Sequence, residues 1–330
     1  MYASTQNIDP DCLRVAVAVI RDKRARVLIA KRPDNVDQGD LWEFPGGKLE
    51  SGESSYQALL REIKEELDLE VVAAHPLIQI PYCYPDRKVL LDVWLVDEFQ
   101  GVMHACEGQP VQWVSQDLLA EYSFPQANRA IIHAIRLSDR YLITPDSTPY
   151  SQPMFLDDLR ISLEAGVRLV QYRDPLLSAK DYQDYAGPVV QLCQEYGADI
   201  LLNADAAMVS ACGAQGVHLN GDRLWSLSER PLGEAQWVAA SCHTRDDLLQ
   251  AARIGVDFVV LSPVKVTQSH PHAVPIGMAA LAGLIRDVGF PVYALGGMLP
   301  VDLGEVRACG AQGIAAITGL YGVSGYKACQ

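Results

Sequence analysis

Short apolar runs alternate regularly with helical stretches from Tyr141 onward, and this rhythm leaves few folds open to the second part of the chain. Continuous apolar strands are typical of a parallel sheet whose outer face is covered by helices. About eight strands close a (β/α)8 TIM barrel, so we predict this α/β architecture, with an open doubly wound sheet as the alternative. The predicted strands are Tyr141–Thr144, Arg168–Arg173, Asp199–Asn203, Gly216–Leu219, Trp237–Ser241, Asp257–Ser262, Pro291–Leu295 and Gly313–Thr318.

The first part of the chain has a different order, with strands, a loop, one helix, two more strands and a closing helix. Leu13–Ile20 and Arg26–Ala30 are apolar runs on either side of Asp22-Lys23, a pattern typical of a hairpin. Val89–Val96 is predicted as a further strand, and Asn128–Leu137 as the closing helix.

The chain of 330 residues is long for one domain, and the change of pattern near Ser138 divides it into domains 1–137 and 138–330. Its formal net charge of −14 argues against nucleic acid or a membrane as a partner, because both require a basic surface. The polar start lacks a signal-peptide pattern, and no apolar run reaches membrane-spanning length. The eight cysteines show no C-x-x-C spacing. We interpret them as reduced thiols and expect a cytoplasmic protein.

An acidic helix is predicted to begin after Ser54. Ser54 and Gln57 have the spacing of a capping box. Glu62, Glu65 and Glu66 lie at i, i+3 and i+4 and therefore share one face. Such a cluster is typical of a magnesium site that also binds phosphate, although a solvated acidic face has the same pattern. The neighbouring apolar stripe consists of Tyr56, Leu59, Leu60, Ile63 and Leu67.

The run around this helix, Gly47-x5-Glu53-x7-Arg61-Glu62-Ile63-x-Glu65-Glu66-x-Asp68-Leu69, resembles the Nudix box. Asp68 stands where the family has glycine, at the helix C-cap, where Asp also tolerates a left-handed turn. From about Arg14 to Leu137 the chain resembles MutT-type Nudix hydrolases, the 8-oxo-dGTP diphosphatases, which implies an α/β/α fold with a mixed sheet. The matching segments are Ala30 to Arg32, Trp42 to Lys48, Tyr84 to Arg87, Glu107 to Pro110 and Phe124 to Asn128.

The resemblance implies a hydrolytic site with bound Mg²⁺, or alternatively Mn²⁺. Glu62, oriented by Arg61, is the implied general base that activates water, and Glu53 and Glu107 are the alternatives. The implied metal ligands are the carbonyl of Gly46 and the carboxylates of Glu62, Glu65, Glu66 and Glu107.

The same resemblance implies a nucleoside triphosphate substrate. It implies that Asn128 reads the purine edge, because an amide donates and accepts at once, and that Lys48 contacts phosphate. The implied reaction is attack of water on a bridging phosphorus, with 8-oxo-dGTP giving 8-oxo-dGMP and pyrophosphate, and its implied role is to sanitise the nucleotide pool for DNA replication and repair. A hydrolase of another nucleoside diphosphate derivative is the alternative. The implied base-pocket residues, which also suit plain core or surface positions, are Arg32, Phe44, Asp86 and Arg87.

Glycines follow the last two predicted barrel strands, at Gly296-Gly297 and Thr318-Gly319. Phosphate is commonly bound at this place in such barrels, although a tight turn also explains a Gly-Gly pair. The second half resembles thiamine-phosphate synthases and TenI-type thiazole tautomerases from Tyr141 to about Tyr321. The matching segments are Gln171 to Arg173, Asn203, Gly216 to Leu219, Ser241 to Thr244, Ser262 to Thr267 with Ser269, and Ala294 to Met298.

This second resemblance implies a phosphorylated ligand at the barrel mouth. His243 matches a histidine of the tautomerases and suits either proton transfer or a structural role. The implied ligand residues are Arg173 and Asn203 for a pyrimidine diphosphate, Gly297 and Thr318 for a thiazole phosphate, and in addition His243 and Thr267.

Several positions depart from the synthase pattern. Pro175 and His270 stand where the synthase has lysines, and Ala204 replaces an acidic residue, which leaves Asp205 and, as a second metal ligand, Asp222. Losing two cations and one magnesium ligand weakens diphosphate binding, because those groups neutralise the leaving group. We therefore expect a degenerate synthase-like or tautomerase-like module. The alternatives are a thiamine-biosynthesis transferase with an accessory Nudix domain, and a barrel that senses a ligand without catalysis.

Overall fold

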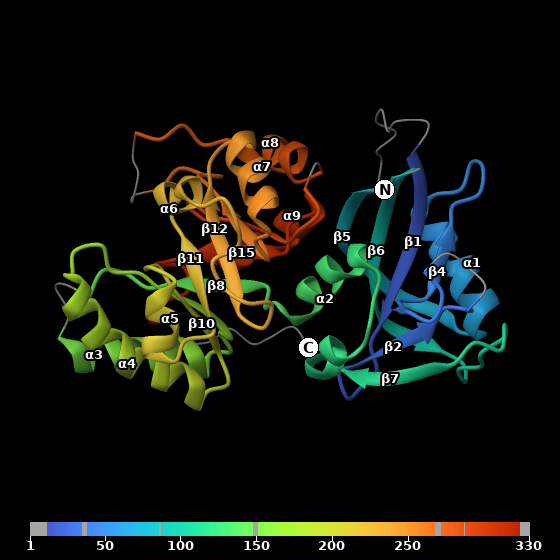
Figure 1. The fold of residues 1–330 in the computed structure, drawn as a ribbon, viewed down its shortest axis with the longest axis horizontal. Helices are drawn as coiled ribbons and strands as arrows, with labels where there is room; N and C mark the ends of the chain where they lie inside the picture. The colour runs from blue at the N-terminus through green and yellow to red at the C-terminus, as the bar shows by residue number, and fades with distance from the viewer. Residues whose placement is uncertain are drawn as a thin grey trace. The chain divides into compact units, whose positions relative to one another are not determined.

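A computed structural model describes residues 12–34, 38–85, 87–147, 151–267, 272–286 and 288–323 (Figure 1). This part of the chain divides into two compact units, with the division between Arg136 and Leu137. None of the described helices is long and apolar enough to cross a membrane.

Two sheets form the first unit. One has four strands in the order β4-β1-β6-β5 and is mixed, because β1 and β6 run parallel while the other pairs are antiparallel. The other has three antiparallel strands in the order β3-β2-β7. The strands are β1 (Cys12–Ile20), β2 (Arg26–Lys31), β3 (Trp42–Glu43), β4 (Gly46–Lys48), β5 (Glu70–Cys83), β6 (Lys88–Gln100) and β7 (Val111–Ser115). The helices are α1 (Ser55–Leu67), α2 (Arg129–Arg136) and the 3-10 turns η1 (Gln116–Glu121) and η2 (Gln126–Asn128).

The predicted hairpin between β1 and β2 is limited to its turn. The turn forms, since the Asp22 N–H donates to the Arg26 carbonyl over 2.9 Å and Arg21 makes an antiparallel bridge with Val27. Beyond it the strands separate into different sheets. The reason is that β1 is already paired on both edges, with β4 and with β6, so no edge remains for β2.

Helix α1 packs its apolar stripe on the first sheet and leaves its acidic face toward the loop before it. The capping box of Ser54 and Gln57 is confirmed, and Asp68 ends the helix in the left-handed conformation with φ 54°, as predicted. Leu59, Ile63 and Leu67 are fully buried, in one cluster with the sheet residues Ala16, Ala18 and Ile20. The glutamates of α1 therefore have a fixed position relative to β4 and β1.

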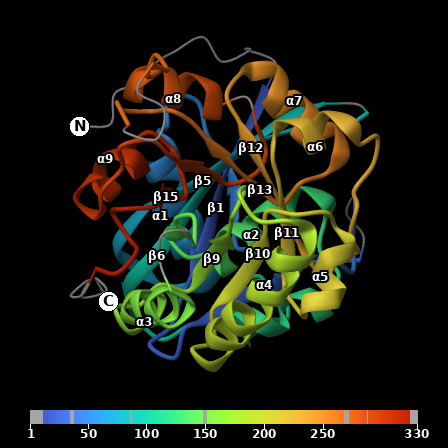
Figure 2. The ribbon, with the colours of Figure 1, turned by 90° about the vertical axis from the view of Figure 1, so that its left-hand side faces the viewer.

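The second unit is a closed eight-stranded barrel, which confirms the predicted architecture and rules out the open sheet. All neighbouring strands are parallel, and helices lie outside them (Figure 2). The strands are β8 (Arg140–Ile143), β9 (Leu169–Tyr172), β10 (Asp199–Leu202), β11 (Gly216–Leu219), β12 (Trp237–Cys242), β13 (Phe258–Leu261), β14 (Val292–Ala294) and β15 (Gly313–Ala316). The helices are α3 (Gln152–Glu164), α4 (Ala179–Glu195), α5 (Ala207–Cys212), α6 (Gly221–Ser226), α7 (Arg245–Ile254), α8 (Gly277–Ile285), α9 (Leu303–Ala308) and the 3-10 turn η3 (Pro300–Asp302).

The barrel interior is filled by side chains. Tyr141, Phe258 and Tyr293 are fully buried, and their ring centroids lie 5.4–5.6 Å apart. A filled interior means that a ligand has access only at the ends of the barrel, where the loops after the strands carry function in this architecture.

Candidate active site

Two glycines of β4 bring the backbone close to β1 and α1. A Cβ atom added at Gly46 would overlap the carbonyl oxygen of Ala16, and one added at Gly47 would overlap the carboxylate of Glu62. Gly46 also has φ 145°, which side chains rarely adopt. The Gly46-Gly47 pair is therefore what allows the loop before α1 to lie against the first carboxylate of the helix.

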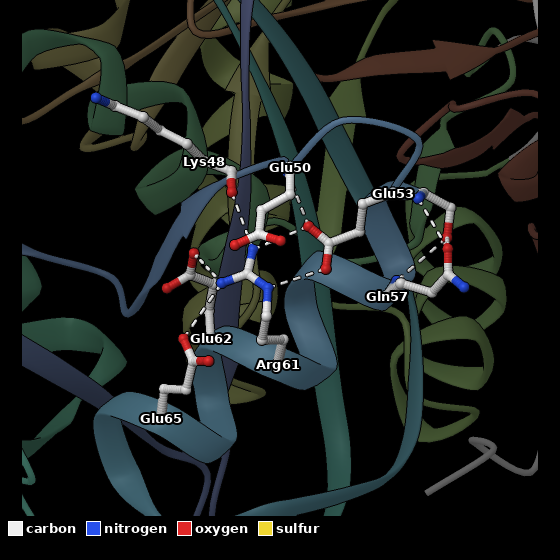
Figure 3. Close-up of polar contacts among 8 residues, drawn as sticks. Lys48, Glu50, Glu53, Gln57, Arg61, Glu62 and Glu65 are labelled. Atoms are coloured by element: carbon white, nitrogen blue, oxygen red, sulfur yellow. Dashed lines mark hydrogen bonds and ion pairs between the residues drawn. The ribbon is translucent and has the colours of Figure 1, made fainter.

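Arg61 is the centre of the polar contacts on α1 (Figure 3). Its Nε and Nη2 donate to the two oxygens of Glu53 over 3.0 and 2.9 Å. Its Nη1 donates to Glu62 Oε1 over 2.8 Å and to Glu65 Oε2 over 3.3 Å, and its Nη2 also donates to the Lys48 carbonyl. These bonds, first those with Glu53, raise the pKa of Arg61, and Arg61 lowers the pKa of Glu53. Arg61 thus ties the loop to the helix.

Glu66 is partly buried and has no cationic partner among the described residues. Its Oε2 accepts a hydrogen bond from the Gly46 N–H over 3.2 Å. Burial is the largest cause that raises the pKa of Glu66 to about 8, and the negative charges of Glu107, Glu62 and Glu43 raise it further. Three other carboxylates therefore act on Glu66, of which Glu62 and Glu43 are paired with arginines, whereas Glu66 itself is not.

The loop that carries Glu107 is bound to the end of α1. The His104 N–H donates to the Leu67 carbonyl over 3.0 Å, and the Cys106 N–H donates to the Glu66 carbonyl over 2.9 Å. These are carbonyls that the end of a helix leaves without a partner. Glu107 is exposed, yet close enough for its charge to act on Glu66 and Glu43.

Phe44 and Asn128, two of the residues predicted to meet the base, lie at the other hydrophobic cluster of the first unit, away from α1. Phe44 is buried and stacks on Phe124, with centroids 5.4 Å apart and planes at 20°. Both pack in one cluster with Ala127, the neighbour of Asn128. Asn128 is 7% exposed, and within the described ranges its side-chain amide makes no hydrogen bond. Its donor and its acceptor are therefore available to a ligand.

The structure gives fewer contacts for the other residues predicted to meet the substrate. Arg32 forms an ion pair with Glu43. Arg87 lies 5.2 Å from the ring centroid of Tyr84. Lys48 is exposed, and its amine points away from Arg61 in Figure 3. Asp86 lies outside the described residues.

In the barrel, two of the predicted ligand residues are bonded to the protein itself. Arg173 Nη1 lies 3.0 Å from Asp146 Oδ1. The Asn203 amide nitrogen donates to Gln171, and its oxygen accepts from Arg223. His243 is exposed, and its Nδ1 lies 2.8 Å from the Ser262 carbonyl oxygen.

The predicted phosphate loops follow β13, β14 and β15. A Cβ at Gly297 would overlap the Val266 carbonyl oxygen, so this glycine is required where the loops after β13 and β14 meet. Thr318 is exposed and Thr267 half-buried. Ser269 and His270 lie outside the described residues.

Comparison with known proteins assigns both units. A family model described as NUDIX domain matches residues 16–134, and one described as thiamine monophosphate synthase matches residues 140–320. The chain belongs to both families.

The relatives agree with this assignment. The 8-oxo-dGTP diphosphatase of Escherichia coli is 35% identical over 124 residues, which are 38% of this chain and 96% of that protein. The thiamine-phosphate synthase of Halorhodospira halophila is 34% identical over 163 residues, 48% of this chain and 77% of that protein. The thiamine-phosphate synthase of Caldicellulosiruptor bescii is 31% identical over 170 residues, which are 51% of this chain and 77% of that protein. The Nudix unit is thus a hydrolase that acts on phosphoric anhydrides, fused to a thiamine-phosphate synthase-like module.

Nudix hydrolases generally use divalent metal ions, and the residues of this site suit one. The buried, unneutralised Glu66 beside other carboxylates is a site where a cation would restore the ionised form. As arranged, no three acidic, histidine or cysteine side chains in the described part of the chain converge closely enough to hold a metal. Two of the carboxylates, Glu62 and Glu65, are bonded to Arg61 instead. Glu65 is 60% exposed and can turn away from it without disturbing the core.

Two features of the Nudix site were not predicted from the sequence. Burial raises the pKa of Glu43, which is paired with Arg32, and the charge of Glu107 raises it further. It belongs to the matched segment from Trp42 to Lys48, and this membership was the available signal. The stacking of Phe124 on Phe44 joins residues eighty positions apart in the sequence and had no local signal.

Proposed function

We propose that the Nudix unit hydrolyses 8-oxo-dGTP to 8-oxo-dGMP and pyrophosphate with Mg²⁺, and so removes an oxidised precursor of DNA. The observation that carries the proposal is Asn128, a 7% exposed residue whose side-chain amide has no hydrogen bond within the described chain and whose neighbour Ala127 packs in the cluster of Phe44 and Phe124. An amide donates and accepts at once, so a purine edge would supply both bonds. The likeness to the Escherichia coli 8-oxo-dGTP diphosphatase supports the same substrate.

The contacts of Arg61 favour Glu62 as the general base over Glu53. Both oxygens of Glu53 are bonded, to Arg61 and to the Glu50 N–H. Glu62 is bonded through Oε1 alone among the described residues, so Oε2 has a free lone pair to accept a proton from water. In the proposed reaction water attacks the phosphorus, its proton passes to Glu62, and the bond to the pyrophosphate oxygen breaks.

A bound Mg²⁺ would neutralise the phosphate charge, held by the Gly46 carbonyl, Glu62, Glu65, Glu66 and Glu107. The loop contacts at Leu67 and Glu66 keep Glu107 near the others. Removing Mg²⁺ with EDTA is therefore expected to stop hydrolysis.

The substrate is tested by measuring kcat/KM for 8-oxo-dGTP and dGTP with the Asn128→Ala variant. Losing a buried hydrogen-bonding group that reads the base costs roughly 1–3 kcal/mol, so the preference for 8-oxo-dGTP should fall about 10- to 100-fold. Asn128→Asp, which keeps the size but loses the amide donor, should lose preference as well. An unchanged preference in both variants, with wild-type melting temperatures, would show that another nucleoside diphosphate derivative is the substrate.

For the barrel, we propose a module that binds thiazole phosphate and lacks synthase activity. The departures at Pro175 and Ala204 and the pairing of Arg173 with Asp146 support this proposal, because they remove or occupy the cations and the metal ligand with which the synthase pattern holds its diphosphate substrate. We expect no thiamine phosphate from hydroxymethylpyrimidine diphosphate and thiazole phosphate, although thiazole phosphate alone should raise the melting temperature. Turnover of the two precursors would instead identify a biosynthetic transferase.

A further inference from the structure

A chain of hydrogen bonds crosses the inside of the barrel and ends at Asn203. Ser241 Oγ lies 2.8 Å from His218 Nε2, and His218 Nδ1 lies 3.1 Å from the Tyr141 hydroxyl. Gln171 Nε2 donates to that hydroxyl over 3.4 Å, and its Oε1 accepts from Asn203 Nδ2 over 3.4 Å. Complete burial lowers the pKa of His218 to about 3, so the imidazole and the side chains hydrogen-bonded to it are uncharged at neutral pH. Its consequence is that the Asn203 amide is fixed, with its nitrogen turned inward.

The outer oxygen of Asn203 holds the guanidinium of Arg223. Arg223 Nη1 donates to Asn203 Oδ1 over 3.2 Å, and its Nε lies 3.1 Å from Asp205 Oδ1. The backbone of Arg223 is fixed as well, since its N–H donates to the Asn220 side chain over 3.0 Å. Arg223 therefore joins the loop after β10 to the segment after β11, at the end of the barrel where ligands bind in this architecture.

The two partners of Arg223 differ in how firmly they are held. Asn203 is anchored by the interior chain, whereas the side chain of Asp205 is 83% exposed. Exposed ion pairs contribute little, so a better acceptor can replace Asp205. Phosphate oxygens are such acceptors, because guanidinium binds them through two parallel bonds. Arg223 is 32% exposed, and its Nη2 makes no hydrogen bond within the described ranges.

The same residues do not suit a divalent metal. Asp205 is already paired with the fixed positive charge of Arg223, which opposes a cation. Ala204, which lies between Asn203 and Asp205, has no oxygen ligand on its side chain, and Asp222 is exposed. The Nudix site differs, because there Glu66 lies near three other carboxylates and has no paired cation of its own among the described residues.

We propose that Arg223 is a fixed cation in place of a metal. The end of the barrel at the loops after β10 and β11 then binds a phosphate monoester or diphosphate without metal, and a phosphate oxygen replaces Asp205 as a partner of Arg223. This inference is independent of the substrate of the Nudix unit. It assigns opposite roles to two bonded residues, since Arg223 attracts the anion while Asp205 competes with it.

Calorimetric titration of the full chain with sodium pyrophosphate in EDTA tests the proposal. Metal-free binding is expected, and Arg223→Gln should weaken it about tenfold or more, as expected for a lost charge-assisted hydrogen bond. Asp205→Ala should strengthen it several-fold by removing the competing carboxylate. Arg253→Gln, a change at an exposed arginine of α7, serves as the matched control and should leave the affinity unchanged.

The opposite result for Asp205 would overturn the proposal. If pyrophosphate binds only with Mg²⁺ and Asp205→Ala abolishes binding, Asp205 is a metal ligand. Absence of binding in EDTA, or an unchanged affinity in Arg223→Gln, would equally contradict the role of Arg223. Should Arg223→Gln fail to fold, the sign of the Asp205→Ala effect still decides, because that exposed side chain contributes little to the fold.

Discussion

Replacing Glu62 with glutamine is expected to lower kcat for nucleotide hydrolysis by about 10²- to 10⁴-fold, the usual effect of losing a general base. Glutamine has the same size and can still accept the hydrogen bond that Arg61 donates to Oε1. It cannot take a proton from water, and it removes one of the negative charges that surround Glu66. Steady-state hydrolysis of 8-oxo-dGTP with Mg²⁺, with the products separated by chromatography, measures the effect.

Glu70→Gln is the matched control, because Glu70 is exposed at the start of β5, just beyond the end of α1. It should retain wild-type kcat, and both variants should keep the melting temperature of the parent. If Glu62→Gln retains more than a tenth of the activity, Glu62 is not the base, and the same substitution at Glu53 and at Glu107 identifies which of the alternatives is.

Local spacing was enough to predict helix α1 and the barrel. The capping box needs two residues three positions apart, and the left-handed cap at Asp68 depends on one residue. The barrel strands are short apolar runs buried on both faces, so each is visible in the sequence without its neighbours. In each case the sequence pattern that predicts the element lies within the element itself or within a few residues of it.

The features that escaped prediction depend on contacts between distant segments. The separation of β1 from β2 follows from the pairing of β1 with β4 and β6, which no local pattern reveals. Arg223 was not singled out, because its role depends on its hydrogen bond to Asn203, twenty positions earlier and in the loop after another strand. In the Nudix motif the residue types were evident, but the sequence could not show that Arg61 would bond to three of its carboxylates at once.

Gly47→Ala is expected to reduce hydrolysis about 10²-fold or more while the protein remains folded. The added methyl group would overlap the carboxylate of Glu62, the end of a flexible side chain that can move aside. Its displacement breaks the hydrogen bond with Arg61 and moves the base from its position, and a shift of about 1 Å can cost 10²-fold in rate. Hydrolysis assays and calorimetric melting of the same preparation measure the two effects separately, and the melting temperature should fall by no more than about 5 °C.

Gly46→Ala provides the contrast, because here the methyl group would overlap the backbone carbonyl of Ala16 in the central strand β1. That carbonyl cannot turn aside, and alanine also tolerates φ 145° poorly. We expect this variant to destabilise the Nudix unit by about 3 kcal/mol or more, from overpacking and backbone strain together. Adjacent glycines would then have separable roles, since Gly46 is required for the fold and Gly47 for the position of Glu62. Full activity in Gly47→Ala would contradict this division, because it would mean that the carboxylate of Glu62 can leave its place beside β4 without consequence for the reaction.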